Sequence, residues 1–153
     1  FITRQQGLMV ARSNPKAVGG INDLVRSDIK FINRQKDSGT RALLDKLLSD
    51  QNIASNKINS CPEEEFTHTA VAAFVAAGMA DVGFGVEAAA RQFNLDFIPV
   101  TSEHYLMICH ERSLKKEAVV QFLAQLRSSA FHSKVAELAG YSAKKCGVIE
   151  LLQ

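Results

Sequence analysis

At 153 residues the chain has enough length for one domain with a substantial hydrophobic core. Its apolar fraction of 46% and charged fraction of 22% are ordinary for a soluble globular protein, and no apolar run is long enough to span a membrane. A net charge of +2 argues against the strong field of a nucleic-acid-binding or membrane-surface protein, so we expect neither contact.

Apolar runs separated by turn and capping residues predict alternating strands and helices. We expect strands at 7–11, 29–32, 81–85, 97–100 and 105–109, with a further short strand inside the polar stretch 50–62. Helical spacing predicts a short turn at 21–25 and helices at 39–49, 63–78, 87–93, 114–127 and 130–138. The acidic residues 63–65 suit the first turn of their helix. This alternation predicts an α/β fold with a mainly parallel sheet.

The three cysteines are an odd number and are widely spaced, which fits neither a disulfide framework nor a metal site. Cys109 ends the apolar run that begins at Tyr105, so we expect a buried thiol there. This cysteine usage favours a reducing, cytoplasmic setting. The sequence shows no signal peptide, although a start at Phe1 rather than Met leaves a preceding segment open.

The turn at 33–41 joins a predicted strand to a predicted helix and has the composition of an anion site. Ser38 and Thr40 offer hydroxyl groups, Gly39 permits close approach to the backbone, and Arg34 and Arg41 carry positive charge. The free N–H groups at a helix N-terminus attract anions. An ordinary capped helix explains the same residues, so both interpretations stay open on physical grounds.

A second helix start, at Thr67, His68 and Thr69, repeats this chemistry. In α/β folds such helix starts follow the carboxyl ends of strands, so both could face one ligand. The alternative is a threonine cap beside a surface histidine. His104 and His110 lack a familiar metal-ligand spacing, and we expect neither a metal nor a cofactor.

Several segments together resemble a known family, the periplasmic-binding-protein-like domain that accompanies molybdate-responsive winged-helix regulators and some molybdopterin-biosynthesis proteins. The matching segments are 4–8, 14–15, 33–45, 65–72, 80–85, 88–90 and 95–99. The resemblance implies a type II fold with helices on both faces of the sheet and a ligand between two lobes. In the tungstate-binding relatives a segment like 34–40 contacts the oxyanion, which implies contacts from Arg34, Ser38, Gly39 and Thr40. The resemblance also implies, less specifically, a role for Thr67, His68 and Thr69, because their helix start matches a place where related binders offer backbone N–H groups.

The family's domain normally begins well before the segment that Phe1 resembles, so the resemblance implies that the first part of the amino-terminal lobe is missing from this chain. We therefore expect a single partial domain over 1–153, with the second lobe at about 27–85. Residues 1–26 and 86–153 would form the crossover and returning segments. Exposed apolar surface on such a partial domain favours a homodimer.

From these features we predict a non-catalytic domain that binds a small anion. The resemblance suggests molybdate or tungstate and a role in a transcription regulator or a molybdenum-cofactor-related protein, while a small organic anion suits the same donors. One alternative is an enzyme domain of molybdopterin biosynthesis, for which Glu87 and His68 are the candidates for a catalytic acid or base. Another is a structural or oligomerisation module that has lost its ligand.

Overall fold

The structure is a computed structural model that describes residues 1–151. Its chain divides into two compact units, which we describe separately. The sheet unit spans Gln5–Thr101, and the terminal unit combines Phe1–Arg4 with Ser102–Gln153. The lobe boundaries expected from the sequence stay a prediction.

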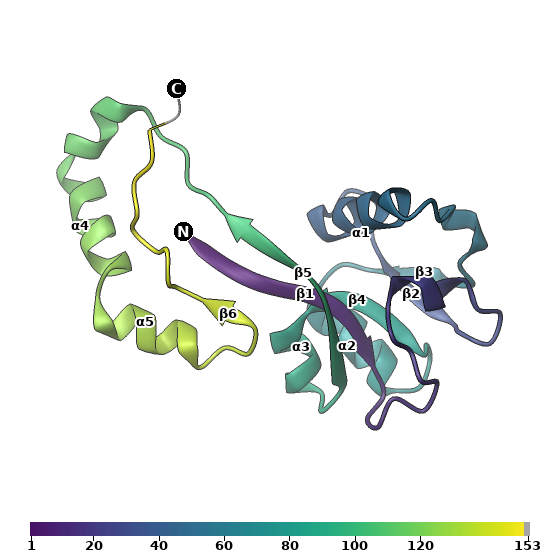
Figure 1. Ribbon diagram of the computed structural model, residues 1–153. Helices are drawn as coiled ribbons and strands as arrows, with labels where there is room; N and C mark the ends of the chain where they lie inside the picture. The colour runs from purple at the N-terminus through teal and green to yellow at the C-terminus, as the bar shows by residue number, and fades with distance from the viewer. Residues whose placement is uncertain (152–153) are drawn as a thin grey trace. The chain divides into compact units, whose positions relative to one another are not determined.

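A mixed β-sheet has the strand order β3-β2-β4-β1-β5 (Figure 1). The strands are β1 (Ile2–Val10), β2 (Phe31–Arg34), β3 (Ser60–Glu65), β4 (Val82–Val86) and β5 (Asp96–Tyr105). β2 runs parallel to both β3 and β4, whereas β1 is antiparallel to β4. In the terminal unit, the short β6 (Tyr141–Ser142) pairs with the first residues of β1. The predicted α/β class is confirmed, with the parallel pairing located in the β3-β2-β4 part.

Among residues 1–151, three α-helices belong to the sheet unit and two to the terminal unit. The former are α1 (Gly39–Asp50), α2 (His68–Ala76) and α3 (Glu87–Gln92), and the latter are α4 (Glu117–Leu126) and α5 (Ser129–Ala136). Short 3-10 helices occupy Ile21–Val25, Ser55–Lys57 and Glu111–Lys115. The helices predicted at 39–49 and 87–93 therefore form close to their expected bounds.

Helices cover both faces of the sheet (Figure 1) because successive strand residues point to opposite sides. Leu8 of β1 is fully buried in the cluster that includes Leu44 and Leu48 of α1. The next residue, Met9, is buried with Val71 and Val75 of α2 in a second cluster. Alternate residues of β1 therefore belong to two separate hydrophobic cores, one on each face of the sheet.

Gly83 allows α2 to lie very close to β4. A Cβ atom placed on this glycine would overlap Cγ1 of Val71 and would lie 3.4 Å from Cγ2 of Val75. The alanine-rich sequence of α2 is consistent with this approach, because Ala72 is also fully buried. Small residues on both elements fix how α2, and therefore its N-terminus, sits on the sheet.

The terminal unit has a small hydrophobic core of its own. Leu126, Val135, Ala143 and Cys146 are its buried residues, and the rings of Phe1 and Phe131 stack beside them with centroids 6.3 Å apart.

Residues 63–65 correct one prediction, because they belong to β3 rather than to the first turn of a helix. Glu64 and Glu65 pair in parallel register with Asn33 and Arg34 of β2. The helix begins only at His68, after Thr67. Pairing with β2 therefore outweighs the local preference of acidic residues for a helix start.

The strand predicted at 105–109 is also wrong. β5 runs continuously through 97–100 and ends at Tyr105, and the next residues form neither helix nor strand. Cys109 is exposed, not buried, and it is a free thiol like Cys61 and Cys146. None of the helices within residues 1–151 is both long and apolar enough to cross a membrane.

Candidate functional site

Two helices begin at the border of the sheet that is formed by the carboxyl ends of its parallel strands, which we call this edge of the sheet. β2 and β3 are parallel, so their carboxyl ends, at Arg34 and Glu65, lie side by side. α1 follows β2 after a four-residue turn at 35–38, and α2 follows β3 after Phe66 and Thr67. The sequence-based expectation that both helix starts share one edge agrees with this topology.

Ser38 holds the start of α1. Its Oγ accepts a hydrogen bond from the N–H of Arg41 at 3.1 Å and donates one to the carbonyl of Gln35 at 2.9 Å. The hydroxyl of Ser38 is thus used within the turn, as in an ordinary N-cap. Gly39 is exposed, and a Cβ added to it would have no neighbour within 4 Å, so the backbone here is open to approach.

Arg34 connects the turn to the segment before α2. Its Nε donates to the carbonyl of Glu65 at 3.1 Å, and its Nη2 donates to the carbonyl of Phe66 at 2.8 Å. The backbone N–H of Gln35 also donates to Glu65, at 3.1 Å. The Arg34 guanidinium therefore positions the start of α2 as well as carrying charge to this edge.

The charge of Arg41 is compensated by carboxylates. Its Nε donates to Asp45 at 3.0 Å, one helical turn away, and its Nη1 donates to Glu64 of β3 at 3.3 Å. The two carboxylates therefore offset the positive charge of Arg41.

Thr67 caps α2 in the same way that Ser38 caps α1. Its Oγ1 accepts a hydrogen bond from the N–H of Ala70 at 3.0 Å. Thr67 and Thr69 are both exposed, whereas His68 is half-buried. The hydroxyl of Thr67 is therefore committed to the helix, and Thr69 lies on the accessible side of its first turn.

Thr40 and His68 bring the two helix starts together. Thr40 is buried, and its Oγ1 lies 3.5 Å from Nε2 of His68. The other ring nitrogen of His68 faces Gly85 of β4, where an added Cβ would lie 2.9 Å from Nδ1. The glycine makes room for the imidazole, which then reaches α1. This contact is the structural link between the two predicted halves of the site.

The first turns of both helices present backbone donors at this edge. By helix geometry, the N–H groups of Gly39 and Thr40 have no acceptor within α1. The partial positive charge of the α1 dipole lies at the same place. The arrangement can hold a small anion through N–H and hydroxyl groups.

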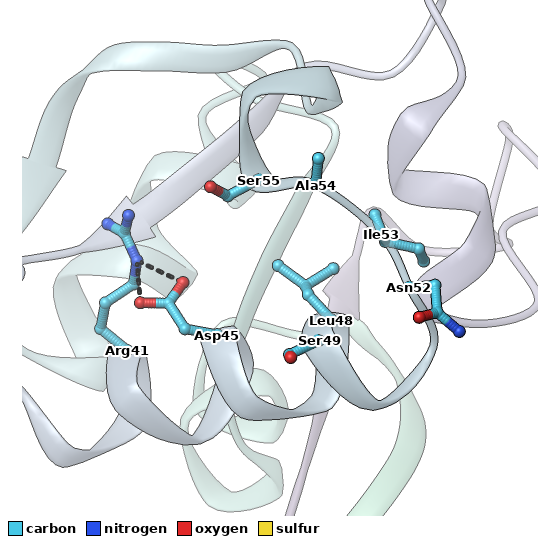
Figure 2. Close-up of a pocket in the computed structure, with 8 residues that line it drawn as sticks. All are labelled: Arg41, Asp45, Leu48, Ser49, Asn52, Ile53, Ala54 and Ser55. Carbon is cyan, nitrogen blue, oxygen red and sulfur yellow. Dashed lines mark hydrogen bonds and ion pairs between the residues drawn. The ribbon is translucent and has the colours of Figure 1, made fainter.

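A separate hollow of about 460 Å³ lies farther along α1 (Figure 2). Figure 2 shows it between the helix and the segment that follows, with Ser49, Asn52 and Ser55 along it and the ion pair of Arg41 and Asp45 beside it. The hollow contains none of the seven predicted ligand residues. No local sequence signal marked it, because its lining comes from a helix face and a loop.

The remaining candidates have structural partners. Oε1 of Glu87, named above as a candidate acid or base, accepts a hydrogen bond from Nη2 of Arg91 at 2.9 Å. His104 Nδ1 lies 3.2 Å from Oγ1 of Thr3, and His110 caps the 3-10 helix at Glu111–Lys115. Within residues 1–151, no three His, Cys, Asp or Glu side chains form a group that could hold a metal ion.

Comparison with known proteins gives a family and several relatives. The profile of the PBP superfamily domain matches residues 1–127. The uncharacterized protein YvgK of Bacillus subtilis (strain 168) is 33% identical over 150 residues, which are 98% of this chain and 48% of YvgK. The chain therefore spans about half the length of that relative.

Two solved structures show the same fold. The substrate binding domain of a putative molybdenum ABC transporter from Clostridium difficile has a TM-score of 0.61 at 18% identity, with 92% of this chain and 64% of that chain covered. The arginine-, lysine-, histidine-binding protein ArtJ from Geobacillus stearothermophilus has a TM-score of 0.59 at 16% identity, with coverage of 94% and 62%.

Proposed function

Because the chain belongs to the PBP superfamily and has the fold of type II periplasmic binding proteins, we propose that it is a non-catalytic domain that binds a small anion. The observation that carries this proposal is the meeting of two helix N-termini through Thr40 and His68 at one edge of the sheet.

The seven predicted residues divide into two roles in this proposal. Ser38 and Thr67 hold the helix starts through their capping hydrogen bonds, and Arg34 fixes the carbonyls that precede α2. The N–H groups of Gly39 and Thr40 contact the anion, and His68 and Thr69 approach it from α2. The guanidinium of Arg34 also contributes positive charge to the site.

An oxyanion such as molybdate or tungstate is the ligand we favour. The likeness to a putative molybdenum transporter's binding domain and the resemblance of 34–40 to a tungstate-contacting segment support this choice. A small organic anion is the alternative, because the carboxylates of Asp45 and Glu64 compensate Arg41 and limit the net charge. The same family resemblance leads us to propose that the domain is part of a regulator or of a molybdenum-cofactor-related protein.

A thermal-melting screen tests the proposal. The chain is heated with molybdate, tungstate, sulfate, phosphate or a series of carboxylates. A ligand at about 100 times its dissociation constant stabilises the folded state by about 2.7 kcal/mol, which raises the melting temperature by several degrees. A shift that is selective among these anions supports a binding domain and identifies the ligand class.

Variants then locate the ligand. Thr40→Val keeps the side-chain shape but removes the hydroxyl that faces His68, so we expect the anion-dependent shift to shrink. Ser49→Ala is the matched control, because Ser49 lies on the same helix but lines the separate hollow. If Ser49→Ala abolishes the shift and Thr40→Val does not, the hollow is the site. If no anion shifts the melting temperature, the proposed function is refuted.

A further inference from the structure

The hollow along α1 has the size and the walls of a small-molecule site. Its volume of about 460 Å³ lies within the range of ligand pockets in proteins, about 300–1,000 Å³. One wall consists of side chains that share a face of α1, namely Arg41, Asp45, Leu48 and Ser49. The segment 52–55 forms the other wall (Figure 2). The hollow is therefore built within the sheet unit, from one helix and the loop that follows it.

The second wall is fixed by the turn that ends α1. The N–H of Asn52 donates to the carbonyl of Ser49, and the N–H of Ile53 donates to the carbonyl of Leu48, both at 2.9 Å. Asn52 has the left-handed backbone conformation that this turn requires, with a φ angle of 58°. The side chain of Ile53 packs against the core cluster that contains Leu48. The hollow is therefore preformed, so a ligand does not have to order its walls.

The guanidinium of Arg41 is held in place at one end of the hollow. Its Nε donates to Asp45 at 3.0 Å and its Nη1 donates to Glu64 at 3.3 Å, and the side chain is only 16% exposed. Within residues 1–151, Nη2 of Arg41 has no hydrogen-bond partner. The hollow therefore offers a fixed donor beside a carboxylate that can accept further hydrogen bonds.

Three polar side chains add to this pair. Ser49, Asn52 and Ser55 line the hollow, and the described part of the chain provides no hydrogen bond to the side chain of any of them. Figure 2 shows the hydroxyl group of Ser55 directed toward the side of the hollow on which Arg41 lies. Hydroxyl and amide groups both donate and accept hydrogen bonds, so a ligand with mixed donors and acceptors can use all three.

We propose that the hollow binds a neutral small molecule with several hydroxyl groups, of the size of a monosaccharide. Arg41 and Asp45 are the only charged residues that line it, and they pair with each other, so the lining has no net formal charge. A ligand hydroxyl group can accept from Nη2 of Arg41 and donate to Asp45. The C–H groups of the ligand then contact the apolar part of the lining, Leu48, Ile53 and Ala54.

Other classes of ligand fit the lining less well. A carboxylate would lie beside the carboxylate of Asp45, and an ammonium group would lie beside the guanidinium of Arg41, so each ion meets a like charge. Five of the eight lining side chains are polar, and an apolar ligand would remove them from water without replacing their hydrogen bonds.

An NMR titration tests the proposal. The ¹⁵N-labelled 153-residue chain is titrated separately with glucose, galactose and ribose, and with butyrate and butanol as charged and apolar comparisons. We expect at least one sugar to cause saturable chemical-shift changes at the amides of residues 48–55. Butyrate and butanol should cause no saturable change there. The result does not depend on anion binding, because the hollow contains none of the seven residues predicted for the anion.

Two variants locate the sugar. Asn52→Gly keeps the left-handed turn, which glycine adopts without strain, but removes the amide. Ser55→Ala removes the hydroxyl group that is directed toward Arg41. Each variant loses one hydrogen-bonding group, so we expect the dissociation constant to rise about 5-fold.

Asn94→Gly is the matched control for Asn52→Gly. Asn94 is exposed, has a φ angle of 55°, and ends α3 with the same pair of backbone hydrogen bonds, from Asn94 to Arg91 at 3.1 Å and from Leu95 to Ala90 at 2.9 Å. Because Asn94 does not line the hollow, the control should leave the affinity for the sugar unchanged.

Three outcomes overturn the proposal. The first is the absence of any saturable shift at residues 48–55 with every sugar. The second is an affinity that neither Asn52→Gly nor Ser55→Ala changes. The third is saturable binding of butyrate or butanol in the hollow without binding of a sugar, which would assign the hollow to an anion or to an apolar ligand.

Discussion

Gly83→Ala tests whether α2 lies as close to the sheet as the structure shows. The added methyl group would overlap Cγ1 of Val71 and would lie 3.2 Å from Cγ2 of Ile32. Both neighbours are β-branched and fully buried, so they have little freedom to move aside. We expect the substitution to destabilise the sheet unit and to shift α2.

The magnitude follows from two opposing effects. Overpacking of a tight core costs about 1–3 kcal/mol. Replacing glycine by alanine also restricts the unfolded chain, which stabilises the folded state by about 0.4–1 kcal/mol. These ranges leave a net loss of up to about 2.6 kcal/mol, with a midpoint of about 1.3 kcal/mol. The midpoint is equivalent to a decrease in melting temperature of roughly 5–10 °C for a unit of this size.

Gly85→Ala is the matched comparison in the same strand. Its Cβ would lie 2.8 Å from Cε of Met9 and 2.9 Å from Nδ1 of His68. Both atoms belong to side chains that can rotate away, so we expect little loss of stability. The displaced imidazole would leave Thr40, however, so the anion-dependent shift should decrease.

Thermal unfolding followed by circular dichroism, with and without the anion found in the screen, measures both effects. The two variants should separate stability from binding. If Gly83→Ala melts at or above the temperature of the unmodified protein, α2 is not packed on β4 as described. If Gly85→Ala binds normally, His68 has no part in the site.

Three further predictions concern single side chains. Thr67→Ala should lower the free energy of unfolding by about 1 kcal/mol through loss of the α2 cap, whereas Thr69→Ala, exposed in the same helix, should change it little in the same denaturant titration. Arg34→Ala should cost about 1–2 kcal/mol because two carbonyls before α2 lose their charged donor; equal stability of Arg34→Ala and the exposed-turn control Lys36→Ala would contradict this. Burial raises the pKa of the Cys61 thiol, so the folded state disfavours the thiolate. The contribution of the Cys61 thiol to stability is therefore complete below the pKa of this thiol in the unfolded chain, about 8.5, and is lost as the pH rises above that value. Cys61→Ala should reduce the fall in melting temperature with rising pH, measured in melts across this range.

The elements with strong local signals could be predicted from the sequence. The leucines that give α1 its stripe are spaced for a helix, and the structure buries Leu44 and Leu48 against the sheet. The sequence also placed the start of α1 in this turn but left its N-cap open between Asp37 and Ser38, and the structure assigns it to Ser38. These features depend on residues a few positions apart, which is the range that periodicity can detect.

The missed features depend on contacts between distant residues. Glu64 and Glu65 look like a helix start until β2 is placed beside them. The pairing of Thr40 with His68 joins residues 28 positions apart, so the sequence could nominate each but not their contact. The exposed state of Ile108 was hidden for a related reason, because an apolar run predicts burial without showing what covers it.

β3 is the outermost strand in the order of the sheet, and its composition affects the tendency of the protein to aggregate at high concentration. An edge strand can recruit strands from other molecules and so start aggregation. Here Pro62 lacks an N–H group for such pairing, and Glu63 to Glu65 place negative charge along the strand. The same carboxylates that were mistaken for a helix start therefore act as a barrier to aggregation. That barrier weakens at high salt, which screens the repulsion between the β3 strands of two molecules.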